Sequence, residues 1–350
     1  MKRIFILLVI AMVSAGAFAA ESTLIDFTLL TSDVTVGEGE AARPENERTL
    51  VDFAEVAGAS FTEEERSLMK SSLFIENWEV DLNSSAQSAM TQANSQVRLA
   101  TVRAGAEPFG DDPVLGARVN FPTEPWNAWA VIRPPFEIQA YANRSQLDAE
   151  GNVVELQEDD EEIEQGDKFE DGHGVVKNVG VIKQVGLNVY GLNFPHSISV
   201  ILQDENNEQH EIFMGYLEFD GWRQLIWDNP NYITDVRDRE LRTYPLYPNL
   251  QPMMKLIGFR VYRDGSNVGG DFITYIRDVT LVYDEARLQL EEAIPHDDLW
   301  GILDQRESER RAAELRRLGN QQVLRFIERQ LQADETEDLR NPQAEEEQQQ

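Results

Sequence analysis

The clearest pattern in the chain is an alternation of apolar and polar residues between residues 178 and 285. Three runs show it: Ile198, Val200 and Leu202; Ile257, Phe259 and Val261; Val279, Leu281 and Tyr283. A period of two residues is typical of β-strands that bury one face. The pattern therefore predicts a β-sheet core, with the aromatic segment 219–232 in its middle.

Similar but shorter runs precede this region. We expect strands at residues 24–30, 49–54, 73–82, 96–103, 114–121, 128–132 and 136–141. Thr62-Glu63-Glu64-Glu65 resembles a capping box and predicts a short helix over residues 61–71, whereas residues 84–94 hold few large apolar side chains and read as a loop. The short spacing between strands predicts one all-β sandwich domain over residues 21–286.

The character of the chain changes after residue 286. Pro295-His296-Asp297-Asp298 is a plausible helix start, Gly319-Asn320 a plausible stop, and Val323–Leu331 a second short helix. Residues 287–332 are therefore predicted to form a helical extension. The Glu- and Gln-rich residues 333–350 lack apolar content, and we expect a disordered acidic tail.

The first twenty residues have the features of a secretory signal. Lys2 and Arg3 precede an apolar stretch from Ile4 to Val13, and Ala17-Phe18-Ala19 offers small residues for cleavage at Ala19 or Ala20. The apolar stretch is short for a membrane span. We expect a cleaved signal over residues 1–20 and a mature protein that is periplasmic or secreted, with no membrane attachment.

The composition of the chain limits which binding partners and which metal or disulfide sites it can have. The chain carries 63 acidic and 31 basic residues, a net charge of −32, which repels nucleic acid and anionic membranes. It has no cysteine, so neither disulfides nor thiolate metal sites can form. Ten acids and one lysine lie in an insertion near residues 155–171. This block is either a solvated loop or, because carboxylates are calcium ligands, a calcium site.

No catalytic or cofactor-binding motif appears in the chain. The four histidines, His173, His196, His210 and His296, share no metal-ligand spacing, and there is no phosphate-binding loop or nucleophile elbow. Two carboxylates would suffice for glycoside hydrolysis, but the sequence singles out no such pair. We predict a protein that is not an enzyme and binds no cofactor.

Two groups of side chains have both a structural and a binding interpretation. Trp126, Trp129, Trp222 and Trp227 suit either the sandwich core or a sugar-stacking surface; we favour the core, with Trp222 and Trp227 on opposite faces of one strand. Residues 304–331 carry seven arginines against five acids. Their helix is either a solvated surface element or a docking arm for an acidic neighbour, through Arg310, Arg311, Arg316 and Arg317.

Three segments carry a family resemblance: Val179-Gly180-Val181-Ile182 through Asn229-Pro230-Asn231-Tyr232, then Leu256–Tyr262, then Phe272–Asp284. They resemble FlaA, the outer-layer (sheath) protein of spirochaete flagellar filaments, and the resemblance covers essentially the whole chain. It implies a jelly-roll sandwich similar to carbohydrate-binding modules, located on the periplasmic flagellum. It also implies a structural role in motility, around a core of flagellins and beside other copies of itself or related sheath proteins. A periplasmic carbohydrate-binding jelly roll remains the alternative, and a degenerate glycoside hydrolase the third.

Overall fold

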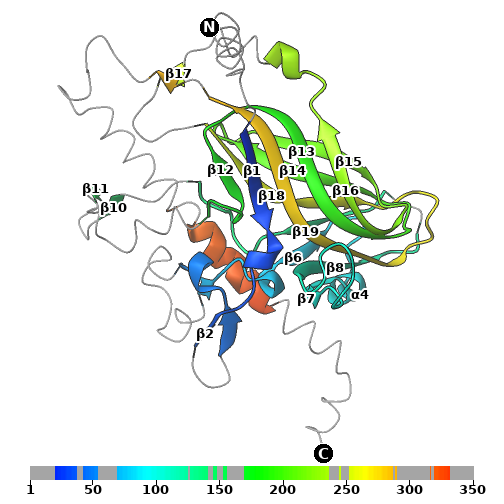
Figure 1. Ribbon diagram of the computed structural model, residues 1–350. Helices are drawn as coiled ribbons and strands as arrows, with labels where there is room; N and C mark the ends of the chain where they lie inside the picture. Colours follow the sequence, from blue (N-terminus) through cyan, green and yellow to red (C-terminus); the bar gives the residue numbers. More distant parts are fainter. Residues whose placement is uncertain are drawn as a thin grey trace, which may run out of the picture.

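The chain crosses repeatedly between two antiparallel sheets, as the computed structural model shows (Figure 1). The structure describes residues 20–37, 42–53, 69–124, 127–140, 145–147, 153–155, 169–235, 244–245, 252–286, 288–289, 316 and 319–331. Within these residues, no helix is long and apolar enough to cross a membrane.

The first sheet contains β1 (Ala20–Asp26), β7 (Gln96–Thr101), β8 (Pro113–Phe121), β13 (Val179–Leu192), β16 (Asp220–Asp228) and β19 (Gly270–Glu285). The second sheet contains β6 (Glu79–Leu82), β9 (Trp129–Arg133), β12 (Val175–Lys177), β14 (Ser197–Asp204), β15 (Gln209–Tyr216) and β18 (Met253–Tyr262). Short pairs lie outside the sheets: β2 (Val34–Val36) with β3 (Arg43–Glu45), β4 (Val51–Asp52) with β5 (Lys70–Ser71), β10 (Ser145–Leu147) with β11 (Val153–Glu155), and β17 (Tyr244–Pro245) with β20 (Leu288–Gln289). The described helices are η1 (Phe27–Leu29), η3 (Glu47–Thr49), η4 (Ile75–Asn77), α4 (Ala89–Asn94), a helical segment at residues 232–235 and the C-terminal helix, residues 319–331.

Eight of these strands have the topology of a jelly roll. In chain order they are β8, β9, β13, β14, β15, β16, β18 and β19, and they hydrogen-bond in the spatial orders β8-β19-β13-β16 and β9-β18-β14-β15. Each long connection therefore passes from one sheet to the other, which is the double Greek key of a jelly roll. The all-β sandwich expected from the alternating pattern is confirmed, as is a C-terminal helix.

The hydrophobic core lies between the two sheets. The first sheet contributes residues such as Leu187 and Leu281, and the second contributes Val200, Phe259 and Val261. Phe259 is fully buried and its ring lies 6.1 Å from that of Phe27 and 6.4 Å from that of Trp78. Burial of these aromatic side chains contributes much of the apolar area that stabilises such a sandwich.

One predicted inward position is wrong. Ile201 pairs with Gly258 and Leu202 with Leu256, so Ile257 is an extra residue in β18. This bulge turns Ile257 away from the core and places Leu256 there, fully buried. A Cβ on Gly258 would lie 2.5 Å from the carbonyl oxygen of Ile132, which explains the glycine at this position.

Three local predictions also differ from the structure. The expected loop 84–94 contains α4, because Ser88 Oγ accepts the Thr91 N–H at 3.1 Å while Thr91 Oγ1 accepts the Ser88 N–H at 2.8 Å. Residues 70–71, expected to end a helix, form β5; the expected helical residues 61–68 lie outside the described part. Residues 136–140 form no strand, although Phe136 and Ile138 are buried.

The C-terminal region combines strand and helix. β20, at the start of the predicted helical extension, pairs in parallel with β17. Residues 319–331 are helical, so Gly319 and Asn320 do not end a helix there. Most of the acidic insertion and all of the expected tail, residues 333–350, lie outside the described residues.

A pair of phenylalanines tests the location of the core. We expect Phe259→Ala to lower the free energy of unfolding by about 3–5 kcal/mol, because it removes a fully buried ring. Phe213→Ala is the matched control, since the Phe213 side chain on the edge strand β15 is 49% exposed, and its cost should stay near or below about 1 kcal/mol. Urea unfolding followed by tryptophan fluorescence measures both; equal losses would contradict this core.

Candidate functional site

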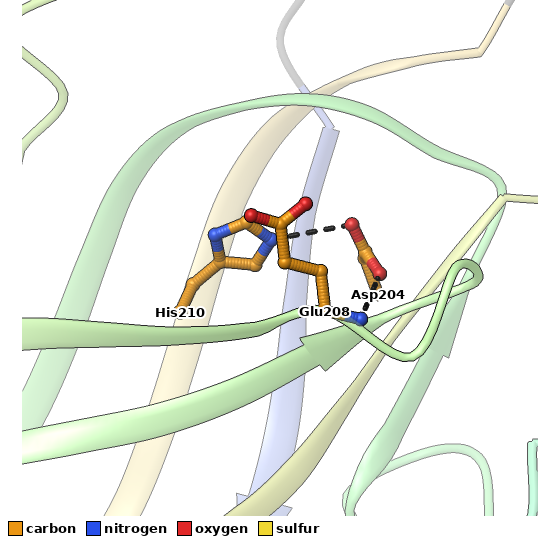
Figure 2. Close-up of side chains that lie close together, drawn as sticks. All are labelled: Asp204, Glu208 and His210. Carbon is orange, nitrogen blue, oxygen red and sulfur yellow. Dashed lines mark hydrogen bonds and ion pairs between the residues drawn. The ribbon is translucent and has the colours of Figure 1, made fainter.

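Three polar side chains converge at the hairpin between β14 and β15. Asp204 ends β14, Glu208 lies in the turn, and His210 is in β15 (Figure 2). Their carboxylate oxygens and imidazole nitrogen lie within 4.8 Å of one another. It is the one group of metal-ligating side chains found in the described part of the chain.

Local hydrogen bonds fix this hairpin. Asp204 Oδ1 accepts the backbone N–H of Asn206 at 2.9 Å and that of Glu208 at 2.8 Å, while Oδ2 lies 3.2 Å from His210 Nε2. Asn207 has a φ of 62°, a left-handed conformation that asparagine tolerates in turns. The alternation on both sides of Asn206-Asn207 would have indicated this hairpin, but only the fold shows that its polar side chains meet.

The hairpin forms one wall of a groove of about 800 Å³. Across from it lie residues 179–182 and the segment after β16. The larger apolar side chains that line the groove are Ile182, Ile212, Trp227, Pro230 and Met254. Five acids line the rim: Asp204, Glu205, Glu208, Glu211 and Asp235.

The charged side chains of this rim are acidic. No lysine or arginine is among the described residues that line the groove. Burial raises the pKa of the Glu205 carboxyl, and the nearby Asp204 carboxylate raises it further. The rim therefore favours a cationic group, whether a divalent ion or a basic side chain.

A second charged cluster holds the C-terminal helix to the body. The Glu79 carboxylate, on β6, is paired with Arg325 at 2.6 Å, with Arg133 at 3.4 Å and with Arg329. Arg325 also donates to the carbonyl oxygen of Pro134 at 3.0 Å. We call Glu79, Arg133, Arg325 and Arg329 the arginine clamp; beside it, the side chain of Val323 is buried.

The arginines of the clamp favour the ionised form of Glu79. Burial alone would raise the Glu79 pKa, but Arg329 and Arg325 outweigh it and lower the pKa to about 2. Asp81 pairs with Arg133 at 2.5 Å, yet burial raises the Asp81 pKa despite that neighbour. The arginines thus interact mainly with Glu79. The C-terminal helix contacts the body of the protein through this largely desolvated ion cluster.

Several of the residues singled out in the sequence lie outside the described part, His296 among them. This also holds for Ala19, Arg310, Arg311, Arg317 and Trp126. Arg316 is exposed and helical. Ala20 is the first residue of β1 and pairs with Tyr283, so the chain enters the sheet at the predicted cleavage site. The calcium hypothesis falls on residues 155–171, of which only Glu155 and Phe169–Asp171 are in described positions.

The tryptophans have different environments. Trp227 is half-buried and packs against the core, in register with Val185. Trp222 pairs with Tyr190 on the opposite face, where its ring lies 5.4 Å from that of Tyr190 and 5.2 Å from that of Phe109. The two rings do point to opposite faces, but the core assignment is wrong for Trp222, which belongs to an aromatic cluster on the outer surface.

The other described histidines have structural environments. His196 is buried against the rings of Phe121 and Phe272, and its Nδ1 accepts the backbone N–H of Asp264 at 3.2 Å. Burial lowers its pKa to about 4. His173 is also buried, and its Nδ1 lies 2.7 Å from the carbonyl oxygen of Glu170. Neither faces the groove.

Comparisons with known proteins identify relatives over nearly the whole chain. Residues 42–292 match the family described as "Flagellar filament outer layer protein Flaa". A "Flagellar filament outer layer protein" of Treponema pallidum is 46% identical over 96% of this chain and 95% of its own length. A protein of the same name from Spirochaeta aurantia is 42% identical, with the same two coverages.

Solved structures add little to this identification. A carbohydrate-binding module of the β-sandwich superfamily covers 58% of this chain and 56% of its own, with 10% identity and a TM-score of 0.28. A likeness at this level carries no argument about binding.

The arginine clamp predicts a pH-dependent stability. Since the Glu79 pKa is lowered from 4.5 to about 2 in the folded protein, its contribution is present above about pH 4.5 and is lost as the pH falls towards 2. We expect Glu79→Gln to cost about 2–3 kcal/mol at pH 7 and to raise amide hydrogen exchange in residues 319–331. Glu76→Gln is the control, because Glu76 lies 4.0 Å from the exposed Arg98 and outside the clamp. Unchanged exchange in Glu79→Gln would contradict the docking role.

Proposed function

Because the chain belongs to the flagellar filament outer layer protein family, we propose that it is a structural subunit of the layer surrounding the core of a periplasmic flagellar filament. The observation that carries this proposal is the identity of 46% and 42% to two proteins of that name, each across 95% of the relative's length. At such coverage we expect the relatives to share the sandwich and the C-terminal helix. The function is thus assigned to the complete subunit and not to one module.

The geometry is compatible with a role in assembly. Two sheets joined by a continuous core make a rigid body, and the arginine clamp fixes an additional helix at one edge. Rigid subunits with several distinct surfaces suit repeated contacts in a layer. The titratable side chains with the largest pKa shifts, Glu79 and His196, have structural partners, so we propose that the subunit acts through contacts and not through catalysis.

The location and partners form the finer part of the proposal. The signal expected over residues 1–20 would direct the subunit to the periplasm, where it would meet the filament. Its partners there would be the core flagellins and other copies of itself or related outer-layer proteins. The carbohydrate-binding alternative is weaker, because Trp222 and Trp227 lie on opposite faces of β16 and form no single sugar-stacking platform.

Immunogold labelling tests the assignment. We expect antibodies against the protein to label filaments along their length after detergent removes the outer membrane. Deletion of the gene should remove the label, make the filaments thinner and impair swimming, and the gene supplied in trans should restore all three. Label spread through the periplasm, with bare filaments, would overturn the proposal.

A further inference from the structure

The acidic groove and the arginine-rich segment of the same chain are complementary. The groove is lined by five acids and several apolar side chains, with no lysine or arginine among the described residues that line it. Residues 306–317 carry five arginines, with Leu315 and two alanines among them. On a chain with a net charge of −32, this segment is a local concentration of positive charge.

We propose that the groove binds the arginine-rich segment, residues 306–317, of a second copy of this chain. The inference rests on the proposed function and deepens it, by naming one contact between neighbouring subunits. Guanidinium groups would pair with the carboxylates of the hairpin rim, and the apolar side chains of the segment would cover Ile182, Trp227 and Met254. Charge complementarity of this kind selects a partner and its orientation.

The position of the clamp favours a second copy as the partner over the same chain. The clamp fixes residues 319–331 to β6, which is one edge of the second sheet, whereas the hairpin rim belongs to β14 and β15 at the other edge. β6 and β15 are the first and last of five neighbouring strands, so four interstrand spacings, roughly 19 Å in total, separate these edges. Figure 1 shows the orange-red C-terminal helix beside β6 and β2, far from the yellow-green helical segment at residues 232–235 that borders the groove. Arg316 lies three residues before the anchored helix, a separation that spans at most about 10 Å of extended chain, less than the distance between the two edges.

The contact has a direction. Each subunit would present an arginine-rich segment at one edge and an acidic groove at the other. Two different surfaces in contact make a heterologous interface, which leaves one segment and one groove open at the ends of every assembly. Such contacts propagate into rings or open helical arrays, the arrangement that a layer around a filament needs.

The hairpin also explains why the receptor surface is preformed. Asp204 accepts two backbone N–H groups within the turn and contacts His210, so the rim keeps its shape without a ligand. Burial, and after it the neighbouring Asp204 carboxylate, raises the pKa of the Glu205 carboxyl. A guanidinium from outside would relieve this repulsion.

Charge exchange between the two surfaces provides the test. Self-association of the purified protein is measured by sedimentation velocity at low and high salt. We expect Arg310→Glu/Arg311→Glu and, separately, Glu205→Arg/Glu208→Arg to weaken association roughly tenfold or more, and the four changes together to restore most of it. The matched control is Arg98→Glu/Arg103→Glu, which makes the same charge change at two exposed residues outside the groove. Association that is unchanged by either reversal would overturn the proposal.

A cross-link gives a second measurement that does not depend on association strength. The natural chain has no cysteine, so Asn206→Cys in one tagged copy and Ala312→Cys in a differently tagged copy are the sole thiols. We expect mild oxidation of the mixture to join the two tags, and Asn127→Cys in place of Asn206→Cys to give little product. A chain that carries both Asn206→Cys and Ala312→Cys tests for the same contact within one copy. A disulfide that forms within that chain, and not between the two tagged copies, would overturn the proposal. Filaments labelled by immunogold would still support the proposed function in that case.

Discussion

The structure depends on the pairing of β19, the longest strand, along both of its edges. β13 pairs with one edge, and the other is divided between β8 over residues 270–276 and β1 over residues 278–283. This single strand thereby joins the beginning, the middle and the end of the chain in one sheet. Its inward side chains, including Phe272, Ile276, Val279 and Leu281, are buried in the core. Because β19 is paired on both edges over most of its length, few of its backbone groups face solvent, and the rest of the sandwich can be arranged around it.

The pairing of β1 with β19 bears on the signal that we expect over residues 1–20. Ala20, at the predicted cleavage site, is already paired with Tyr283. The strand that completes the first sheet thus begins where the signal is expected to end. If the expected signal remained attached, it would continue directly from β1, a strand of the sandwich. The expected cleavage site therefore lies at the first residue of that strand.

The strands were more predictable than the surfaces. Alternation located β14, β18 and β19 because each buries one face of a sheet, and it failed locally at Ile257, where a bulge shifts the period by one residue. The sequence did not predict α4, because its helical signal is a Ser88–Thr91 capping pair and not an apolar stripe. The groove was not predictable, because its walls come from β13, the β14–β15 hairpin and the segment after β16, which only the jelly-roll topology brings together. Trp222 illustrates the same limit: its aromatic neighbours Phe109 and Tyr190 are distant in sequence.

The exposed edges of the two sheets restrict how such subunits can meet. β15 and β16 end their sheets on one side, and an unprotected edge strand invites pairing with another strand. β15 is interrupted by an irregularity near Gly215 and carries Glu211 at its surface, while β16 exposes Arg223 and Asp228. These charged side chains and the irregularity disfavour continuous strand addition between copies. At the opposite edge, Glu79 of β6 is already occupied by the arginine clamp. In the proposed layer, contacts between copies would therefore come from side chains at the ends and faces of the sandwich, and not from backbone pairing at these edges.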